Sequence, residues 1–148
     1  MISVGEAAPD FTLPDEGGQE VSLSDFSGKR VLLVFYPLDF SPVCTDQLKL
    51  YSDISEDLDK AGVTPLGISV DSAFAHKAFQ DSLGIRTSLL ADFEPKGAVA
   101  KSYGAYLDGA GHSNRSLVLI DGEGKVEWVY ETRTPLDIPS PNLILDAI

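Results

Sequence analysis

Residues 30–44 read RVLLVFYPLDFSPVC, and this stretch decides how the chain folds. Its first part, residues 30–37, is nearly all apolar and rich in β-formers, which predicts a central strand buried on both faces. Pro42 is favoured in the first turn of a helix, because the amide proton that proline lacks would be unpaired there. The stretch therefore predicts a strand, a bend and a helix, with Cys44 in the first helical turn.

Apolar runs alternate with helical patterns on either side of this stretch. The pattern after Pro42 predicts a helix to about residue 60, which Gly62 ends. Further strands are expected at 10–13, 20–23, 63–70, 88–92, 115–121 and 125–132. Further helices are expected after Ser24, from the cap Ser72 to about residue 83, within 94–105, and after Asn142.

This order of elements predicts an α/β fold. The strand, helix and strand between residues 30 and 70 should make a parallel pair with a right-handed crossover. The sequence GEG at 122–124 separates two late strands and indicates an antiparallel hairpin. We therefore expect a thioredoxin-like fold, in which helices flank a mixed central β-sheet, and we interpret residues 1–148 as a single domain.

The composition limits the classes of protein to which this chain can belong. The 148 residues are 43% hydrophobic, which is enough for a core without disulfides, and the net charge of -12 disfavours nucleic acids and anionic membranes as partners. Plain solubility and adaptation to high salt both explain this acidity. The chain start does not resemble a signal peptide, and the longest apolar run is far shorter than the ~20 residues of a membrane span. A single cysteine fits a reducing compartment, so we expect a cytoplasmic protein.

Cys44 can be interpreted as an inert buried residue or as a reactive thiol. A helix N-terminus offers unpaired N–H groups and a partial positive charge, which stabilise a thiolate and favour the reactive interpretation. The thioredoxin-type C-x-x-C pair is absent, because Ser41 stands at its first position. A cysteine hydrolase needs an imidazole base, and neither His76 nor His112 can be placed beside Cys44 from sequence. Peroxide reduction needs only a thiolate, polarising donors and a cation, and it leaves a sulfenic acid.

The stretch YPLDFSPVC, residues 36–44, resembles the peroxiredoxin signature P-x-x-x-T/S-x-x-C at Pro37, Ser41 and Cys44. The resemblance extends over nearly the whole chain. Five segments are similar to peroxiredoxin segments in the same order: residues 5–13, 29–45, 67–79, 89–105 and 114–128. The one-cysteine members of the bacterioferritin comigratory protein type and the alkyl hydroperoxide reductase E type are the most similar.

This resemblance implies roles for individual residues. Cys44 would be the peroxidatic nucleophile, and Pro37 would shield its thiolate. Ser41 would hydrogen-bond the peroxide oxygens, while the backbone N–H groups of Val43 and Cys44 face the peroxide. Arg115 would hold thiolate and substrate, which suits its fixed charge and rigid fork of donors, although a surface ion pair is the alternative for this residue.

The sequence also raises questions about the roles of other residues near the motif. Tyr36 and Phe40 are expected either as walls of the substrate pocket or as packing residues. Gln47 stands where the family usually has a glutamate that orients the arginine, so it can accept a hydrogen bond but adds no charge. Lys49 occupies the position of a resolving cysteine in some members of the family, so this chain has no local thiol to form a disulfide.

We therefore expect a thiol-dependent peroxidase that reduces hydrogen peroxide and organic hydroperoxides. Its sulfenic acid would be reduced by an external thiol: thioredoxin, a glutaredoxin-like protein or a small thiol. No cofactor and no metal are expected, since Asp71 and His76 alone make no metal site. A homodimer is left open. The alternative is a redox-sensing or binding module on the same fold, whose cysteine is oxidised without turnover.

Overall fold

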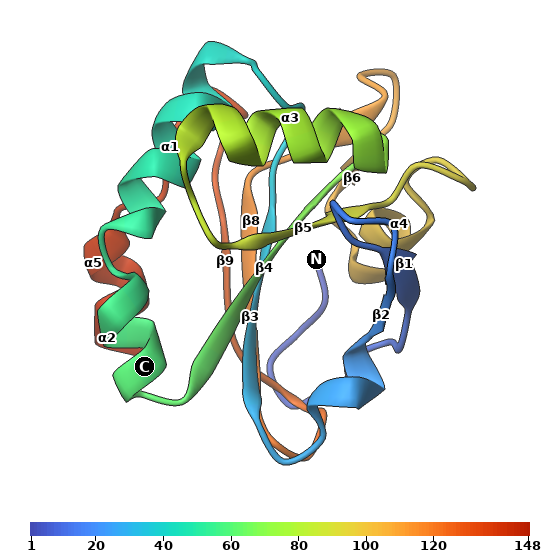
Figure 1. The fold of residues 1–148 in the computed structure, drawn as a ribbon. Coiled ribbons are helices and arrows are strands. Elements are labelled where there is room, and N and C mark those ends of the chain that lie inside the picture. The colour runs from blue at the N-terminus through green and yellow to red at the C-terminus, as the bar shows by residue number, and fades with distance from the viewer.

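A five-stranded sheet in the order β5-β4-β3-β8-β9 lies at the centre of the computed structural model, which describes residues 1–148 (Figure 1). Its strands are β3 (Arg30–Phe35), β4 (Val63–Ser69), β5 (Ser88–Ala91), β8 (Ser116–Ile120) and β9 (Val126–Glu131). β3 is parallel to β4 and antiparallel to β8, and β4 and β5 are parallel. β8 and β9 form the expected antiparallel hairpin. The prediction of a mixed central sheet is confirmed.

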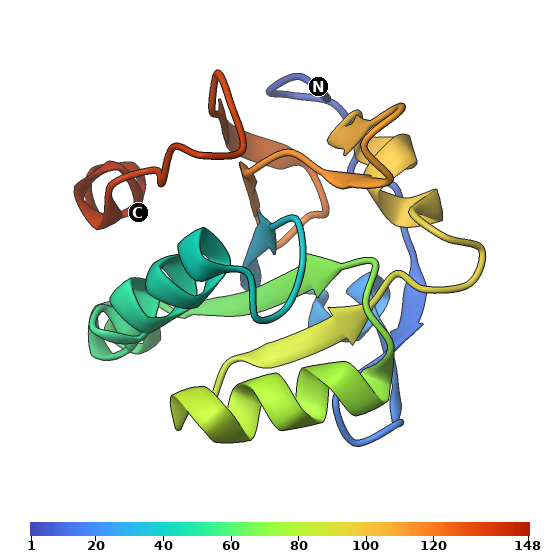
Figure 2. The ribbon, with the colours of Figure 1, turned by 90° about the horizontal axis from the view of Figure 1, so that it is seen from above.

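Helices cover both faces of this sheet (Figure 2). One face carries α1 (Pro42–Ser52), α2 (Ser55–Lys60), α3 (Ala73–Leu83) and α5 (Pro141–Ala147). The other face carries α4 (Ala98–Tyr103), the 3-10 helix η1 (Leu23–Phe26) and the hairpin of β1 (Thr12–Pro14) and β2 (Glu20–Ser22). A small hairpin that the sequence did not indicate joins β6 (Tyr106–Leu107) to β7 (His112–Ser113). None of these helices combines the length and the apolar character that crossing a membrane requires.

β3 is buried on both faces, as its continuous apolar sequence predicts. Leu33 and Phe35 point into the cluster under α4 and η1, whereas Leu32 and Val34 point into the cluster under α1 and α3. Successive side chains on a strand alternate between faces, so a strand in the middle of two apolar layers needs apolar residues at every position. The strand therefore leads directly from the core to the loop before α1.

The single helix expected from Pro42 to about residue 60 is wrong, because the structure has two helices. The amide groups of Asp53 and Ile54 bond to carbonyls three residues earlier, at Leu50 and Tyr51, which tightens and ends α1. The turn brings Ile54 into the core, where it is 7% exposed. The free energy gained by burying Ile54 at the break therefore outweighs the free energy that a continuous helix would have gained.

Two predicted helix caps are also wrong. The last helix starts at Pro141 and is capped by Ser140, whose Oγ accepts a hydrogen bond from the Asn142 amide at 3.2 Å. The N-cap of η1 is Ser22 rather than Ser24. In both cases an earlier serine takes the cap, and the caps at Ser72 and Gly84 of α3 are as predicted.

Candidate active site around Cys44

Cys44 lies in the first turn of α1, directly after the loop that follows β3. Ser41 is the N-cap residue in extended conformation, and Pro42 occupies the first helical turn. The amide groups of Val43 and Cys44 have no carbonyl one turn earlier inside α1, and no loop carbonyl accepts from them. The strand, bend and helix are thus as predicted, with two free N–H donors beside the buried sulfur.

Arg115 is the charged group that the fold brings to Cys44. It directly precedes β8, which pairs with β3 so that Ser116 lies opposite Phe35, and the neighbouring Arg115 therefore lies at the same edge of the sheet as Cys44. Its Nη1 donates to Cys44 Sγ at 3.2 Å. The arginine is only 2% exposed and belongs to none of the ion pairs of the protein, so the alternative of a surface ion pair is wrong.

Two neutral acceptors hold Arg115 in place. Its Nε donates to the Pro135 carbonyl at 2.6 Å, and its Nη1 donates to Gln47 Oε1 at 2.7 Å. Gln47 is completely buried, and its Nε2 has no hydrogen-bond partner in the protein. Gln47 therefore orients the guanidinium without cancelling its charge, and the full positive charge acts on the sulfur.

Tyr51 lies behind Gln47 on the same face of α1, because residues four apart on a helix are neighbours. Its hydroxyl donates to the Pro139 carbonyl at 2.7 Å. Burial raises the pKa of Tyr51 to about 12, and the nearby Gln47 side chain and the Arg115 charge offset only part of this rise. Tyr51 is therefore a neutral wall of the site. The helical spacing of positions 44, 47 and 51 in the sequence could have indicated it.

Ser41 and Pro37 lie in the bend before α1. The Ser41 hydroxyl donates to the Leu38 carbonyl at 3.1 Å, which leaves its oxygen free to accept from a ligand. Pro37 is buried. Both residues are attached to the loop that leads from the sheet edge to Cys44, in the positions that the motif predicts.

Tyr36 and Phe40 have different environments. Tyr36 is completely buried and its hydroxyl donates to Asp39 Oδ1 at 2.6 Å, which supports the packing interpretation for this residue. Phe40 is 54% exposed, and its ring centroid lies 5.0 Å from that of Phe79 in α3. Of these two residues, only Phe40 is therefore available at the surface beside the bend.

The two histidines do not contact Cys44, whose only side-chain hydrogen-bond partner is Arg115. His112 lies in β7 and contacts the Ser113 carbonyl. His76 is buried in α3, where Nδ1 contacts Asp39 Oδ2 at 2.7 Å. A cysteine hydrolase arrangement is thus not built here.

Asp71 lies directly before the N-cap of α3 but does not cap this helix. Ser72 caps that helix, and Asp71 Oδ2 instead accepts from the Asp39 amide at 2.8 Å. Asp39 was not predicted as part of any site. An acidic residue within an otherwise apolar stretch was the sequence signal that could have found it.

A thioredoxin-like fold that presents a cysteine at a helix start, next to an unpaired buried arginine, defines a thiol-based redox protein. A sequence model described as the AhpC/TSA family matches residues 4–129, and the chain belongs to this family. Alkyl hydroperoxide reductase E of Mycobacterium tuberculosis is 36% identical over 100% of this chain and 97% of its own length. The putative peroxiredoxin bcp of Coxiella burnetii is 40% identical over 87% of this chain and 88% of its own length.

Solved structures agree with this assignment. The peroxidoxin BcpB from Mycobacterium tuberculosis matches with a TM-score of 0.88 at 25% identity and covers 99% of this chain and 96% of its own. The reduced 2-Cys peroxiredoxin of Plasmodium vivax matches with a TM-score of 0.87 at 32% identity, over 98% of this chain and 79% of its own. The chain is a peroxiredoxin, that is, a thiol-dependent peroxidase. The family resemblance inferred from the sequence is confirmed.

Proposed function

We propose that Cys44 is the peroxidatic cysteine and that it reduces hydrogen peroxide and organic hydroperoxides. The observation that carries this proposal is the 3.2 Å contact between Arg115 Nη1 and Cys44 Sγ, made by an arginine without a carboxylate partner. A fixed, desolvated cation beside a thiol favours the thiolate, which is the nucleophilic form. A relative named for alkyl hydroperoxides, identical at 36% of positions, supports the organic substrates.

The reaction balances with groups of this chain and one proton. The Cys44 thiolate attacks the hydroxyl oxygen of the hydroperoxide, so an S–O bond forms and the O–O bond breaks. The product on the protein is a sulfenic acid, and the leaving alkoxide or hydroxide takes a proton to become an alcohol or water. The free amides of Val43 and Cys44, together with Arg115, are the donors for the developing negative charge.

Ser41 and Pro37 have supporting roles in this proposal. The Ser41 oxygen, which is oriented by its donation to Leu38, accepts a hydrogen bond from the peroxide hydroxyl group. Pro37 is buried at the start of the bend and keeps water from the thiolate. Gln47 acts through the arginine that it orients rather than by contact with the peroxide.

The second half of the cycle needs a thiol from outside the chain, because Cys44 is the only cysteine. A first external thiol converts the sulfenic acid to a mixed disulfide and releases water. A second thiol then restores Cys44 and leaves as part of a disulfide. Thioredoxin, a glutaredoxin-like protein and a small thiol are the candidate reductants.

Mass spectrometry and a turnover assay test this function. Reduced protein mixed with one equivalent of peroxide is expected to gain one oxygen on Cys44, and Cys44→Ser is expected to leave the peroxide unconsumed. Sustained consumption with an added thiol system supports the enzyme. Oxidation of Cys44 that none of the three reductants reverses would instead support the non-turnover redox sensor.

A further inference from the structure

The bend between β3 and α1 is attached to the protein interior by a polar network whose members are buried, except for the half-buried Asp71. We propose that Tyr36, Asp39, Asp71 and His76 form a positioning network for residues 37–41, the bend that carries Ser41 to the peroxide. This inference rests on the proposed function of Cys44. None of the four side chains hydrogen-bonds to the sulfur, whose side-chain partner is Arg115, so they act through the bend.

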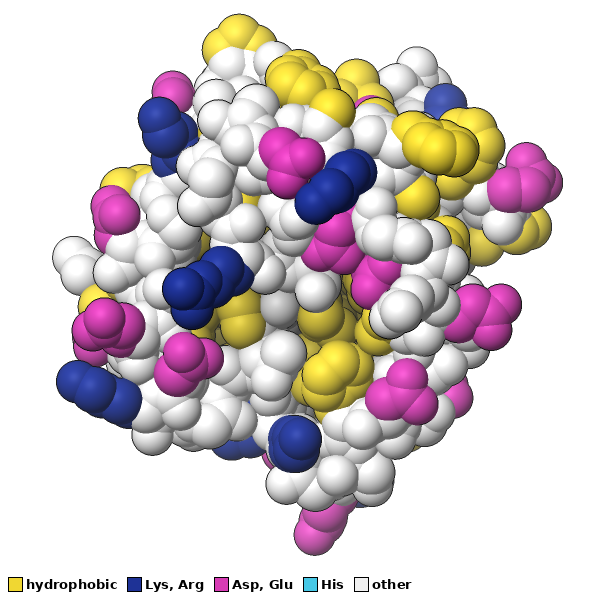
Figure 3. Space-filling view, viewed as in Figure 1, with side chains coloured by type: hydrophobic (Ala, Val, Ile, Leu, Met, Phe, Trp, Pro, Cys, Tyr) yellow, Lys and Arg dark blue, Asp and Glu magenta, His cyan; other side chains and the backbone are white.

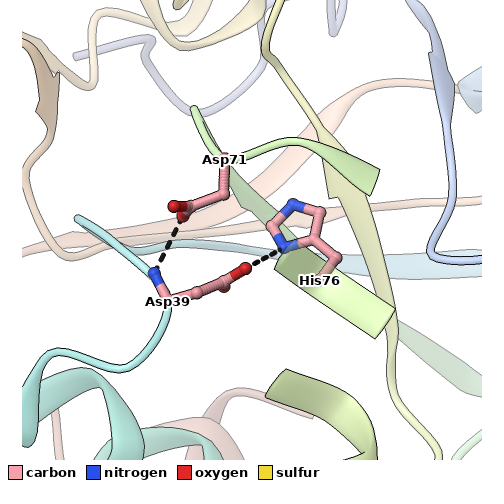
Figure 4. A group of neighbouring side chains, drawn as sticks. All are labelled: Asp39, Asp71 and His76. Carbon is pink, nitrogen blue, oxygen red and sulfur yellow. Dashed lines mark hydrogen bonds and ion pairs between the residues drawn. The ribbon is translucent and has the colours of Figure 1, made fainter. Parts of the chain in front are cut away.

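Asp39 is held at three points, each from a different part of the chain, and Figure 4 shows the two at Asp71 and His76. Its amide donates to Asp71 Oδ2 at 2.8 Å, where Asp71 follows the end of β4. Its Oδ1 accepts from the Tyr36 hydroxyl at 2.6 Å, at the end of β3. Its Oδ2 lies 2.7 Å from His76 Nδ1 in α3. The backbone and both oxygens of one residue are therefore fixed in the middle of the bend.

The hydrogen bonds of His76 determine where its protons lie. Its Nε2 is 3.0 Å from the Leu90 carbonyl, which can only accept, so Nε2 carries a proton. Nδ1 lies 2.7 Å from Asp39 Oδ2, and two lone pairs at this distance would repel. One proton therefore lies between them, and His76 connects the bend to β5. Both side chains are almost completely buried, at 0% and 1% exposed.

A metal-binding site is the alternative interpretation of this cluster. The possible ligand atoms of Asp39, Asp71 and His76 lie within 4.8 Å of one another. Hydrogen bonds already occupy these atoms. The Ser69 hydroxyl and the Asp39 amide both donate to Asp71 Oδ2, at 2.5 and 2.8 Å. A cation at this oxygen would meet two protons, so the donor pattern favours the hydrogen-bonded network.

The bend needs such an anchor because Phe40 has a φ of 66°. This left-handed conformation is unfavourable for a residue with a Cβ. Asp39 is fixed on one side of Phe40, and on the other side Ser41 bonds to the Leu38 carbonyl through its hydroxyl at 3.1 Å. Without the anchor the bend can relax to an unstrained conformation, which would move Ser41 away from the peroxide.

Two substitutions of Asp39 separate positioning from other effects. Asp39→Ala removes both carboxylate contacts, and we expect the rate constant for Cys44 oxidation by peroxide to fall by about 10- to 100-fold, as for other small displacements of reacting groups. Asp39→Asn can accept from Tyr36 and donate to a neutral His76, so it is expected to react within about threefold of the native protein. Rescue by asparagine would show that geometry, rather than charge, is what the network supplies.

A control variant accounts for lost stability. Val126→Ala truncates a residue that is 2% exposed in the core on the opposite face of the sheet. It is expected to lower the midpoint of thermal unfolding while the oxidation rate constant of the folded protein is unchanged. The proposal therefore requires the oxidation rate constant to fall further in Asp39→Ala than in Val126→Ala, which is destabilised elsewhere.

Hydrogen exchange gives a second readout that does not depend on peroxide. The hydrogen-bonded amides of residues 39, 41 and 45 are expected to exchange faster in Asp39→Ala than in Asp39→Asn or Val126→Ala. Equal oxidation rates and equal exchange in Asp39→Ala and the native protein would overturn the proposal, as would an asparagine variant as slow as the alanine variant. If the native protein fails to react with peroxide, the proposed function fails, and the exchange comparison still decides the positioning role.

Discussion

The residue that distinguishes this site chemically is Gln47. It is a neutral, buried acceptor for Arg115, where a carboxylate would have paired the guanidinium charge. Charges interact strongly in a buried environment because little water screens them. The charge of Arg115 is therefore directed at Cys44 Sγ, and the uncharged partner makes the site more positive than an Arg–Glu pair would.

The charge at position 47 can be changed without a change in size. Gln47→Glu places a carboxylate within reach of Arg115 Nη1, and because this carboxylate pairs part of the guanidinium charge, we expect alkylation of Cys44 by iodoacetamide to slow. The rate at neutral pH should fall by about tenfold, which corresponds to about 1.4 kcal/mol. Gln47→Met is the matched control, since it removes the acceptor but adds no charge. An alkylation rate for Gln47→Glu that equals or exceeds that of the native protein would contradict this prediction.

At the scale of elements, side chains decide where helices begin. α1 starts at Pro42 and α3 at Ser72, whose Oγ accepts from the Ala75 amide at 3.2 Å. α4 has Gly97 at its N-cap, which offers no side-chain acceptor. Asp92 supplies acceptors from the end of β5 instead, taking the Val99 and Ala100 amides at 3.1 and 2.9 Å. A distant carboxylate thus replaces the local cap.

This distant cap makes the stability of the fold depend on pH. Burial raises the pKa of Asp92 above its usual 3.8, and the two amide hydrogen bonds and the charge of Lys101 oppose this shift only in part. Between the unfolded and folded pKa values the folded state binds more protons, so the contribution of Asp92 to stability falls as pH rises through this window. We expect the free energy of unfolding of the native protein minus that of Asp92→Asn to decrease over this range.

Denaturant titrations at several pH values measure this difference. The other carboxylates titrate equally in both proteins, so the subtraction isolates Asp92. Asp121→Asn is a control at a half-buried aspartate whose Oδ1 accepts from the amides of Glu123 and Lys125. If the difference in the free energy of unfolding between the native protein and Asp92→Asn rises with pH, then burial is not the dominant influence on the pKa of Asp92.

At the scale of the whole molecule, the acidic surface is the main electrostatic feature. Acidic side chains are spread over the face in Figure 3 among fewer basic ones, in agreement with a net charge of -12 from 23 acidic and 11 basic residues. The folded protein has only three ion pairs, and one of them is the buried Asp39–His76 contact. Repulsion between carboxylates therefore outweighs attraction at this surface.

This imbalance predicts a stabilising effect of salt. Raising the ionic strength from about 10 mM to about 150 mM shortens the screening length from about 30 Å to about 8 Å, which weakens long-range repulsion in the compact state. We expect the midpoint of thermal unfolding to rise over this range. A plateau above it favours plain solubility as the reason for the acidity, while a continued rise into molar salt favours adaptation to high salt. A lower midpoint would mean that salt bridges dominate.

Much of the fold was predictable because local patterns and tertiary packing agree. The continuous apolar run of β3, the serine and glycine at the two ends of α3 and the GEG turn between β8 and β9 all specify their elements locally. Prediction failed where packing outweighed the local signal. The break before Ile54 and the Asp92 cap of α4 both depend on groups that only the folded chain brings together.

The sequence by itself determined that Cys44 would stand in the first turn of a helix after a buried strand, since proline and apolar periodicity act over a few residues. It could name Arg115 only by resemblance. Tertiary structure decided that Arg115 contacts the sulfur and that Gln47 holds it, because pairing of β3 with β8 joins positions 71 residues apart. It also decided the place of Asp39, whose amide and carboxylate meet Asp71 and His76 only when β3, β4 and α3 pack together. Hydrogen bonds of buried polar groups depend on distance in space, which a linear pattern does not contain.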